Sequence, residues 1–126
     1  MAIADPAALI RSLSNKQGLA ALLDVLPLGV AIMDRDGTLL AVNRNYESLT
    51  GVTGEQVQGI RCLHALRSDY CMRNCPVLSG WTDKRPRTLE ANIINRDREK
   101  VSVHLTLAPL VADDGSIRGV IETLMP

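Results

Sequence analysis

The sequence predicts an α+β domain built around one five-stranded antiparallel sheet. Two short apolar runs flank a turn at residues 34–37, and three segments of period-two alternation follow between residues 86 and 124. The stretch between these two groups has helical signals. Strands, helices and then more strands in this order are typical of one antiparallel sheet with helices packed on it. At 126 residues the chain is long enough for one hydrophobic core.

A helical extension is predicted at the N-terminus. Asp5 and Pro6 provide a capping side chain and a first residue with fixed φ, and Ser14-Asn15 provides a second cap. The second helix carries a leucine stripe that Pro27 ends. The stripe consists of Leu19, Leu22, Leu23 and Leu26. It packs either on its own domain or against a partner's copy, and periodicity does not separate the two.

The first two strands form a β-hairpin. Residues 28–33 and 38–42 are mostly apolar, and Asp34-Arg35-Asp36-Gly37 between them has turn chemistry, with a glycine available for positive φ. Asn43 then begins a short helix over residues 44–49, which Gly51 closes. Another short helix begins at Thr53-Gly54-Glu55 and ends by Gly59.

The last three strands form a meander. Leu89, Ala91 and Ile93 alternate with polar residues, and the same pattern returns from residue 101 to residue 108 after a charged turn. Asp113-Asp114-Gly115 is a second turn, and residues 117–124 form the final strand.

Composition excludes several classes of function. Fourteen basic side chains balance fourteen acidic ones, and Trp81, Tyr46 and Tyr70 are the whole aromatic content. We therefore expect no direct binding of nucleic acid, which needs positive charge or stacking platforms. No stretch approaches the apolar length of a membrane span, and the start of the chain lacks a targeting signal. The odd, clustered cysteine count argues against a secreted disulfide scaffold, so we expect a cytoplasmic protein.

The order of these segments resembles the PAS domain family. LPLGVAIMDRDGTLLAVNRNYESLTG (residues 26–51) is similar to the opening of such domains, with its Asp-x-Asp-Gly turn and helix-starting Asn. Residues 52–59 are similar to the helix that follows, and APLVADDGSIRGVIETL (residues 108–124) is similar to the closing hairpin. The resemblance covers roughly residues 22–124, and each motif is loose while the order is specific.

The resemblance implies a PAS-like five-stranded antiparallel sheet with short helices over one face, enclosing a small cavity. It divides the chain into an N-terminal helical extension (residues 1–21) and a sensor domain (residues 22–126). It also implies a sensory module of a bacterial signalling protein, attached to an effector such as a kinase, a DNA-binding domain or an ATPase. A homodimer through the N-terminal helix and the sheet face is expected. No nucleophile–base pair stands out, so we expect no catalytic activity.

Every cysteine of the chain lies in the segment Cys62-x8-Cys71-x3-Cys75-Pro76. Thiolates bind soft metals and iron–sulfur clusters, and Arg61, Arg67 and Arg73 nearby would lower the pKa of the thiols. Three thiolates with a fourth ligand, His64 or Asp69, can complete a zinc site or hold an iron–sulfur cluster. The spacing matches no standard signature of either kind.

Two other interpretations of the cysteines stay open. Two thiols can form a disulfide under oxidation with the third resolving it, which would make a redox switch. Alternatively, the three side chains simply fill the core, since free cysteine is among the most buried residue types. Redox or metal sensing is the function that we predict, and the alternatives are a small organic ligand in an aliphatic cavity or pure dimerisation.

Flavin and haem are the cofactors that the sequence argues against. Cys62, which follows Gly59-Ile60-Arg61, is in register with the reactive cysteine of light-sensing flavin domains. The residues next to Cys62 differ from the signature of those domains. Val103 and Ile121 occupy strand positions where that family has side-chain amides that bind the flavin ring. A haem needs an axial ligand, and His104 alternates to the face opposite the Val-Leu stripe. Glu122-Thr123 is either a contact toward the effector or an ordinary solvent-facing pair.

Overall fold

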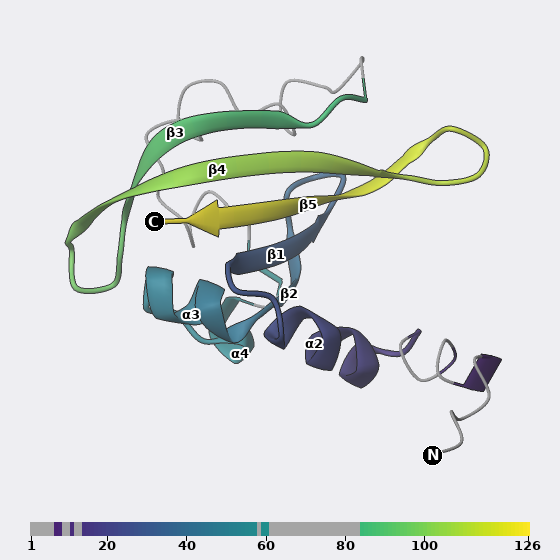
Figure 1. Cartoon of the computed structure of the whole chain (residues 1–126), viewed down its shortest axis with the longest axis horizontal. Helices are drawn as coiled ribbons and strands as arrows, with labels where there is room; N and C mark the ends of the chain where they lie inside the picture. The colour runs from purple at the N-terminus through teal and green to yellow at the C-terminus, as the bar shows by residue number, and fades with distance from the viewer. Residues whose placement is uncertain (1–6, 9–10, 12–13, 58, 61–83) are drawn as a thin grey trace.

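The computed structural model describes residues 7–8, 11, 14–57, 59–60 and 84–126. Within them, five strands form one antiparallel sheet in the order β2-β1-β5-β4-β3, and the helices gather at its β1–β2 end (Figure 1). The elements are α2 (Lys16–Asp24), β1 (Gly29–Asp34), β2 (Leu39–Val42), α3 (Arg44–Thr50), α4 (Gly54–Val57), β3 (Arg87–Ile94), β4 (Lys100–Val111) and β5 (Ile117–Met125). The predicted α+β class and five-stranded sheet are confirmed.

Alternating side chains give the sheet one buried face. In β3, β4 and β5 the apolar positions of the period-two pattern are buried, and the intervening positions are more exposed. The core of the domain combines this face with residues of β1, β2 and α3. Its fully buried members are Ala31, Met33, Leu39, Tyr46, Ala91, Ile93, Val103, Leu105, Leu107, Val120 and Leu124.

The turn between β1 and β2 is organised by one carboxylate. Asp34 Oδ1 accepts hydrogen bonds from the amides of Asp36 (2.9 Å) and Thr38 (3.0 Å), and Gly37 has a φ of 83°. Aspartate side chains favour such turns because they bond their own backbone two residues on. The register then shifts in β2, so that both Leu39 and Val42 pack toward the core. The sequence predicted the hairpin but not this shift.

A glycine allows β1 and β5 to pair closely. Gly119 lies opposite Asp34, and a Cβ atom at this position would stand 2.7 Å from the carbonyl oxygen of Met33. Such a contact is shorter than real Cβ atoms show, so any side chain here would force the strands apart. The glycine in this strand therefore marks a close approach of two backbones.

The side chain of Asn43 forms hydrogen bonds to three elements, α2, β1 and α3. Its Oδ1 accepts hydrogen bonds from the amides of Tyr46 (2.9 Å), in the first turn of α3, and of Val30 (2.8 Å) in β1. Its Nδ2 donates to the carbonyls of Leu23 (2.8 Å), in α2, and Leu28 (2.9 Å). The residue is only 1% exposed. The sequence predicted the helix cap, and the structure adds three long-range bonds.

Helix α2 packs on the domain through part of its leucine stripe. Asn15 caps the helix by accepting from the amide of Gly18 at 2.7 Å. Leu23 is 4% exposed and contributes to the core, whereas Leu22 is 45% exposed. The four leucines therefore do not act as one buried stripe. Residues 7, 8 and 11 are helical, and the rest of the first predicted helix lies outside the described residues.

The Asn43 network makes a prediction about stability. Replacing Asn43 by Ala removes four hydrogen bonds, three of them buried. A buried polar group left without its partner costs about 1–3 kcal/mol, so we expect the free energy of unfolding to fall by about 3 kcal/mol or more. Urea unfolding followed by circular dichroism measures it.

Asn45→Ala is the matched control, because this asparagine makes an exposed bond to the carbonyl of Leu26. Its loss should cost below about 1 kcal/mol. Equal losses for the two variants would contradict the role assigned to Asn43.

Candidate functional site

The inner face of the sheet is aliphatic except at one position of β5. Val120 and Leu124 are buried there and belong to the core. Glu122 lies between them in the alternation and is 0% exposed. The register pairs it with Ala31 of β1 and Leu107 of β4, both fully or almost fully buried. A carboxylic side chain thus lies within the interior of the described domain.

The interior position of Glu122 corrects one reading of the sequence. Glu122 is not part of a solvent-facing pair. The pattern Val120-x-Glu122-x-Leu124 carried the signal, because alternate residues of a strand share a face. Burying a carboxyl group in an apolar environment is costly, and such groups concentrate at functional sites. Glu122 is therefore a functional candidate whose residue the sequence singled out but whose interior position it did not predict.

The predicted cysteine site lies outside the described residues. This applies to Cys62, Cys71, Cys75 and His64, and also to Asp69, the alternative fourth ligand. Within the part of the chain that the structure describes, no group of three or more His, Cys, Asp or Glu side chains is arranged to hold a metal ion.

The described residues on either side of the cysteine segment lie next to the two edge strands of the sheet. Upstream, the amide of Leu39 donates to the carbonyl of Ile60 (2.8 Å), and the amide of Gly59 donates to the carbonyl of Leu39 (3.1 Å). These bonds lie at β2, one edge of the sheet. Downstream, Lys84 precedes β3, which is the other edge. The segment that carries the cysteines therefore connects the two edges.

Lys84 also bonds the turn that leads into β5. Its Nζ donates to the carbonyl of Gly115, and its own φ is 56°, a value uncommon outside glycine. In the same turn, Ser116 donates to Asp114 Oδ1 through its hydroxyl (2.6 Å) and its amide (2.9 Å). These bonds lower the pKa of Asp114, with a smaller contribution from the charge of Lys84. Lys84, which follows the cysteine segment in the chain, is thus bonded to the turn that precedes β5.

His104 is exposed on the outer face of the sheet. Its Nδ1 lies 3.8 Å from the carboxylate of Glu90, and its side chain is 57% exposed. The predicted orientation, opposite the Val-Leu stripe, is confirmed. This histidine does not face the interior, where an axial haem ligand would be needed.

The two strand positions compared with flavin-binding amides fall on different faces. Val103 is 2% exposed and belongs to the inner face. Ile121 alternates with the buried Val120 and Glu122 and belongs to the outer face. Ile121 therefore carries no information about an interior cofactor, and the absence of flavin stays a prediction that rests on Val103 and the neighbours of Cys62.

Comparison with known proteins identifies the family. A family model described as the PAS fold matches residues 23–125. The chain therefore belongs to the PAS family, whose members are sensory signalling modules and in general not catalysts. The predicted family resemblance is confirmed. No curated protein matches the chain.

Solved structures agree with this fold. The PAS domain of a protein from Colwellia psychrerythraea shares 18% identity with a TM-score of 0.73, covering 86% of this chain and 93% of that one. The PAS domain of an HTR-like protein from Haloarcula marismortui shares 21% identity with a TM-score of 0.69, covering 96% and 98%. A light-oxygen-voltage (LOV) domain from a blue-light activated histidine kinase of Erythrobacter litoralis shares 24% identity with a TM-score of 0.66, covering 79% and 95%. At these identities the likeness shows the fold alone.

Among the described residues, no helix combines the length and apolar character that crossing a membrane requires.

The interior position of Glu122 gives a testable prediction. Glu122→Gln keeps the volume and a hydrogen-bond acceptor, so the free energy of unfolding should change by at most about 1 kcal/mol. Glu122→Ala leaves a cavity and should cost about 2 kcal/mol or more. Urea unfolding measures both variants.

Glu90→Ala is the matched control, because the Glu90 side chain is 81% exposed on the opposite face. It should be nearly neutral, since surface substitutions usually change stability by about 0.5 kcal/mol or less. A cost for Glu122→Ala no larger than that of Glu90→Ala would contradict the interior position.

Proposed function

We propose that this PAS domain is the sensory input module of a larger signalling protein, such as a histidine kinase or a transcriptional regulator. Its signal is the state of Cys62, Cys71 and Cys75. The observation that carries this proposal is that all three cysteines of the chain fall within fourteen residues, surrounded by arginines. Arginine beside a thiol favours the thiolate, which is the form that binds metals and reacts with oxidants.

The three thiolates would act in one of two ways. With His64 or Asp69 as a fourth ligand, they would hold zinc or an iron–sulfur cluster. Without a metal, two of them would form a disulfide on oxidation and the third would resolve it. Either event adds covalent or coordinate bonds within one short segment and therefore restricts its conformation.

The bonds at the two ends of the segment support a route for the signal. Upstream, Leu39 of β2 bonds both Gly59 and Ile60. Downstream, Lys84 bonds Gly115, two residues before β5 begins. A change in the cysteine segment would therefore act on an edge strand and on the turn before β5. We propose β5 as the strand that passes the change to an attached effector.

A second candidate function is the binding of a small organic ligand at the inner face of the sheet. Glu122 favours it, because a carboxyl group on an otherwise aliphatic sheet face gives a ligand one polar anchor. In that case the cysteines would be structural. A bound metabolite released on denaturation, and lost in Glu122→Gln, would support this candidate over cysteine sensing.

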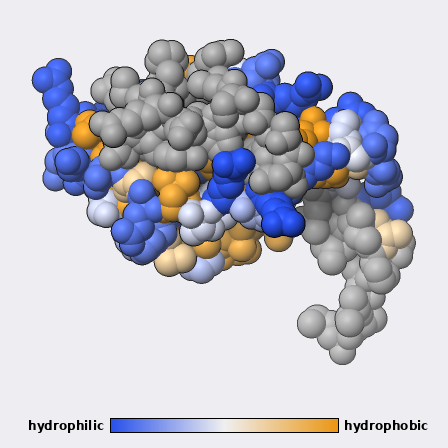
Figure 2. All heavy atoms as spheres, turned by 90° about the horizontal axis from the view of Figure 1, so that it is seen from above, coloured by the Kyte–Doolittle hydropathy of each residue, from blue (hydrophilic) through white to orange (hydrophobic). Residues whose placement is uncertain are grey.

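A homodimer is part of the proposal. Apolar side chains reach the surface in several places (orange in Figure 2). They include Leu22 of α2 (45% exposed) and Val25, which directly follows α2 (75% exposed). Together with the outer face of the sheet, they offer a surface for a second copy. The double substitution Leu22→Lys and Val25→Lys should give a monomer by light scattering, and a dimer that persists would refute this surface.

Further parts of the proposal concern the setting of the domain. We propose that it works in the cytoplasm, that it binds no nucleic acid directly, and that it has no catalytic activity of its own. Residues 1–21 would form a helical extension and residues 22–126 the sensor domain. These proposals rest on the balanced charge, the few aromatic residues and the clustered thiols.

The cysteine proposal is tested on protein purified without oxygen. Absorption and metal analysis should show either iron with sulfide or zinc, as thiolate sites give. Cys62→Ser, Cys71→Ser and Cys75→Ser should each reduce the bound metal. If the site is a thiol switch, the parent protein should instead form an intramolecular disulfide on mild oxidation, detected by mass spectrometry.

Ser116→Ala is a control that leaves the thiols intact, since this serine bonds Asp114 in the β4–β5 turn. It should keep the metal content and the thiol reactivity of the parent. Parent protein that is metal-free, together with three thiols that form no disulfide, would contradict the proposal.

A further inference from the structure

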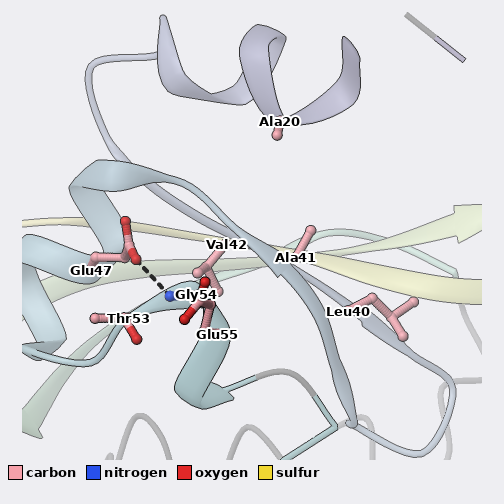
Figure 3. A pocket seen from close by; sticks show the side chains of 8 residues that line it. All are labelled: Ala20, Leu40, Ala41, Val42, Glu47, Thr53, Gly54 and Glu55. Atoms are coloured by element: carbon pink, nitrogen blue, oxygen red, sulfur yellow. Dashed lines mark hydrogen bonds between the residues drawn. The ribbon is translucent and has the colours of Figure 1, made fainter. Parts of the chain in front are cut away.

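A groove runs between the N-terminal helix and the edge of the sheet, away from the inner face. It has a volume of about 470 Å³ and is lined by residues of α2, β2, α3 and the α4 region. Figure 3 shows Ala20 of α2 facing the β2 residues across the groove, with α4 at one end. The lining consists of Ala20, Leu40, Ala41, Val42, Glu47, Thr53, Gly54 and Glu55.

The groove has an apolar part and an acidic part. Ala20 and the three β2 residues have aliphatic side chains, and Leu40 remains 49% exposed. At the other end stand Glu47 and Glu55, and none of the described lining residues is basic. The charge of the lining is therefore negative at one end only. A complementary occupant has an apolar body and one positive head.

The carboxylate of Glu47 is held in position by the backbone. Its Oε2 accepts a hydrogen bond from the amide of Gly54 at 2.6 Å, as the dashed line in Figure 3 shows. Glu47 itself lies in the first turn of α3, which Asn43 caps. A carboxylate fixed in this way orients its second oxygen without further ordering cost, and a carboxylate oxygen bonds cationic donors more strongly than neutral ones.

The size of the groove indicates whether its ligand is a small molecule or a protein. Small-molecule sites have volumes of about 300–1,000 Å³, which includes the value found here. A stable protein interface needs about 800 Å² on each partner, far more than eight lining residues offer. The dimensions favour a ligand with a short apolar chain.

We propose that this groove binds a small organic cation, an alkylammonium or alkylguanidinium. The alkyl chain lies on Leu40, Ala41 and Val42, and the positive head bonds Glu47 and Glu55. Since Ala20 belongs to α2 and Glu47 to α3, the ligand contacts both sides of the groove. Binding would therefore stabilise the docked position of the N-terminal helix.

The test is an NMR titration of the 126-residue chain with hexylammonium. Hexanol and hexanoate, which share the chain but not the charge, serve as comparison probes. We expect hexylammonium to shift the amide signals of Ala20, Ala41 and Gly54 and to bind at least about tenfold more tightly than hexanol or hexanoate, because charged hydrogen bonds are the stronger ones.

Substitutions then assign the binding to the groove. Glu55→Gln, at an exposed residue, should weaken hexylammonium binding several-fold, and Glu47→Gln should weaken it further. Asp97→Asn, an exposed acid in the β3–β4 turn, is the matched control and should leave binding unchanged. If Glu47→Gln fails to fold, Ala41→Leu replaces it, since the larger side chain would fill the groove while the carboxylates remain.

Three results would overturn the proposal. The first is hexanol or hexanoate binding as tightly as hexylammonium. The second is shifts that stay the same in Glu55→Gln and Ala41→Leu. The third is the absence of any shift up to low-millimolar hexylammonium. This third result also overturns the proposal if a lysine-containing peptide binds the groove, because the small amine then does not bind there.

Discussion

One buried side-chain amide holds together the part of the domain that carries its N-terminal helix. The Asn43 side chain bonds Leu23, Leu28, Val30 and Tyr46, so that α2, β1 and α3 share one hydrogen-bonding centre. No apolar residue could replace it, because both a donor and an acceptor are needed in the same buried position. An aspartate would cap α3 and bond β1, but it would lose the two bonds that Nδ2 donates.

This constraint explains how the PAS fold presents its functional parts. With α3 fixed on β1, the Tyr46 side chain closes the core and Glu47 reaches the groove beside α2. The central strand of the five-stranded sheet is β5, with Glu122 on its inner face. The cysteine segment connects the two edges of this sheet. The proposed sensing segment, the proposed output strand and the proposed cation groove are therefore separate parts of one domain and share no residues.

Interactions between residues close in the sequence allowed much of this fold to be predicted. The Asp34 turn, the Asn43 cap and the period-two strands each follow from neighbouring residues. The remainder depends on contacts between distant residues. The exposure of Leu22 follows from how α2 docks, and the shift of β2 follows from its pairing with β1. For Glu122 the sequence left a contact toward the effector and a solvent-facing position open, and the burial of this side chain follows from the place of β5 in the sheet.

We propose that the state of the cysteines reaches the sheet through the residues that flank their segment, Gly59 and Ile60 upstream and Lys84 downstream. Amide hydrogen exchange, compared between reduced protein and the oxidised or metal-loaded form, tests it most directly. Exchange should change at Leu39 and Gly59 and in the turn at Gly115–Ser116, while the amides of Val30 and Tyr46 at the Asn43 centre stay equally protected. Identical exchange throughout residues 84–126 and at Leu39 in the two forms would contradict the claim.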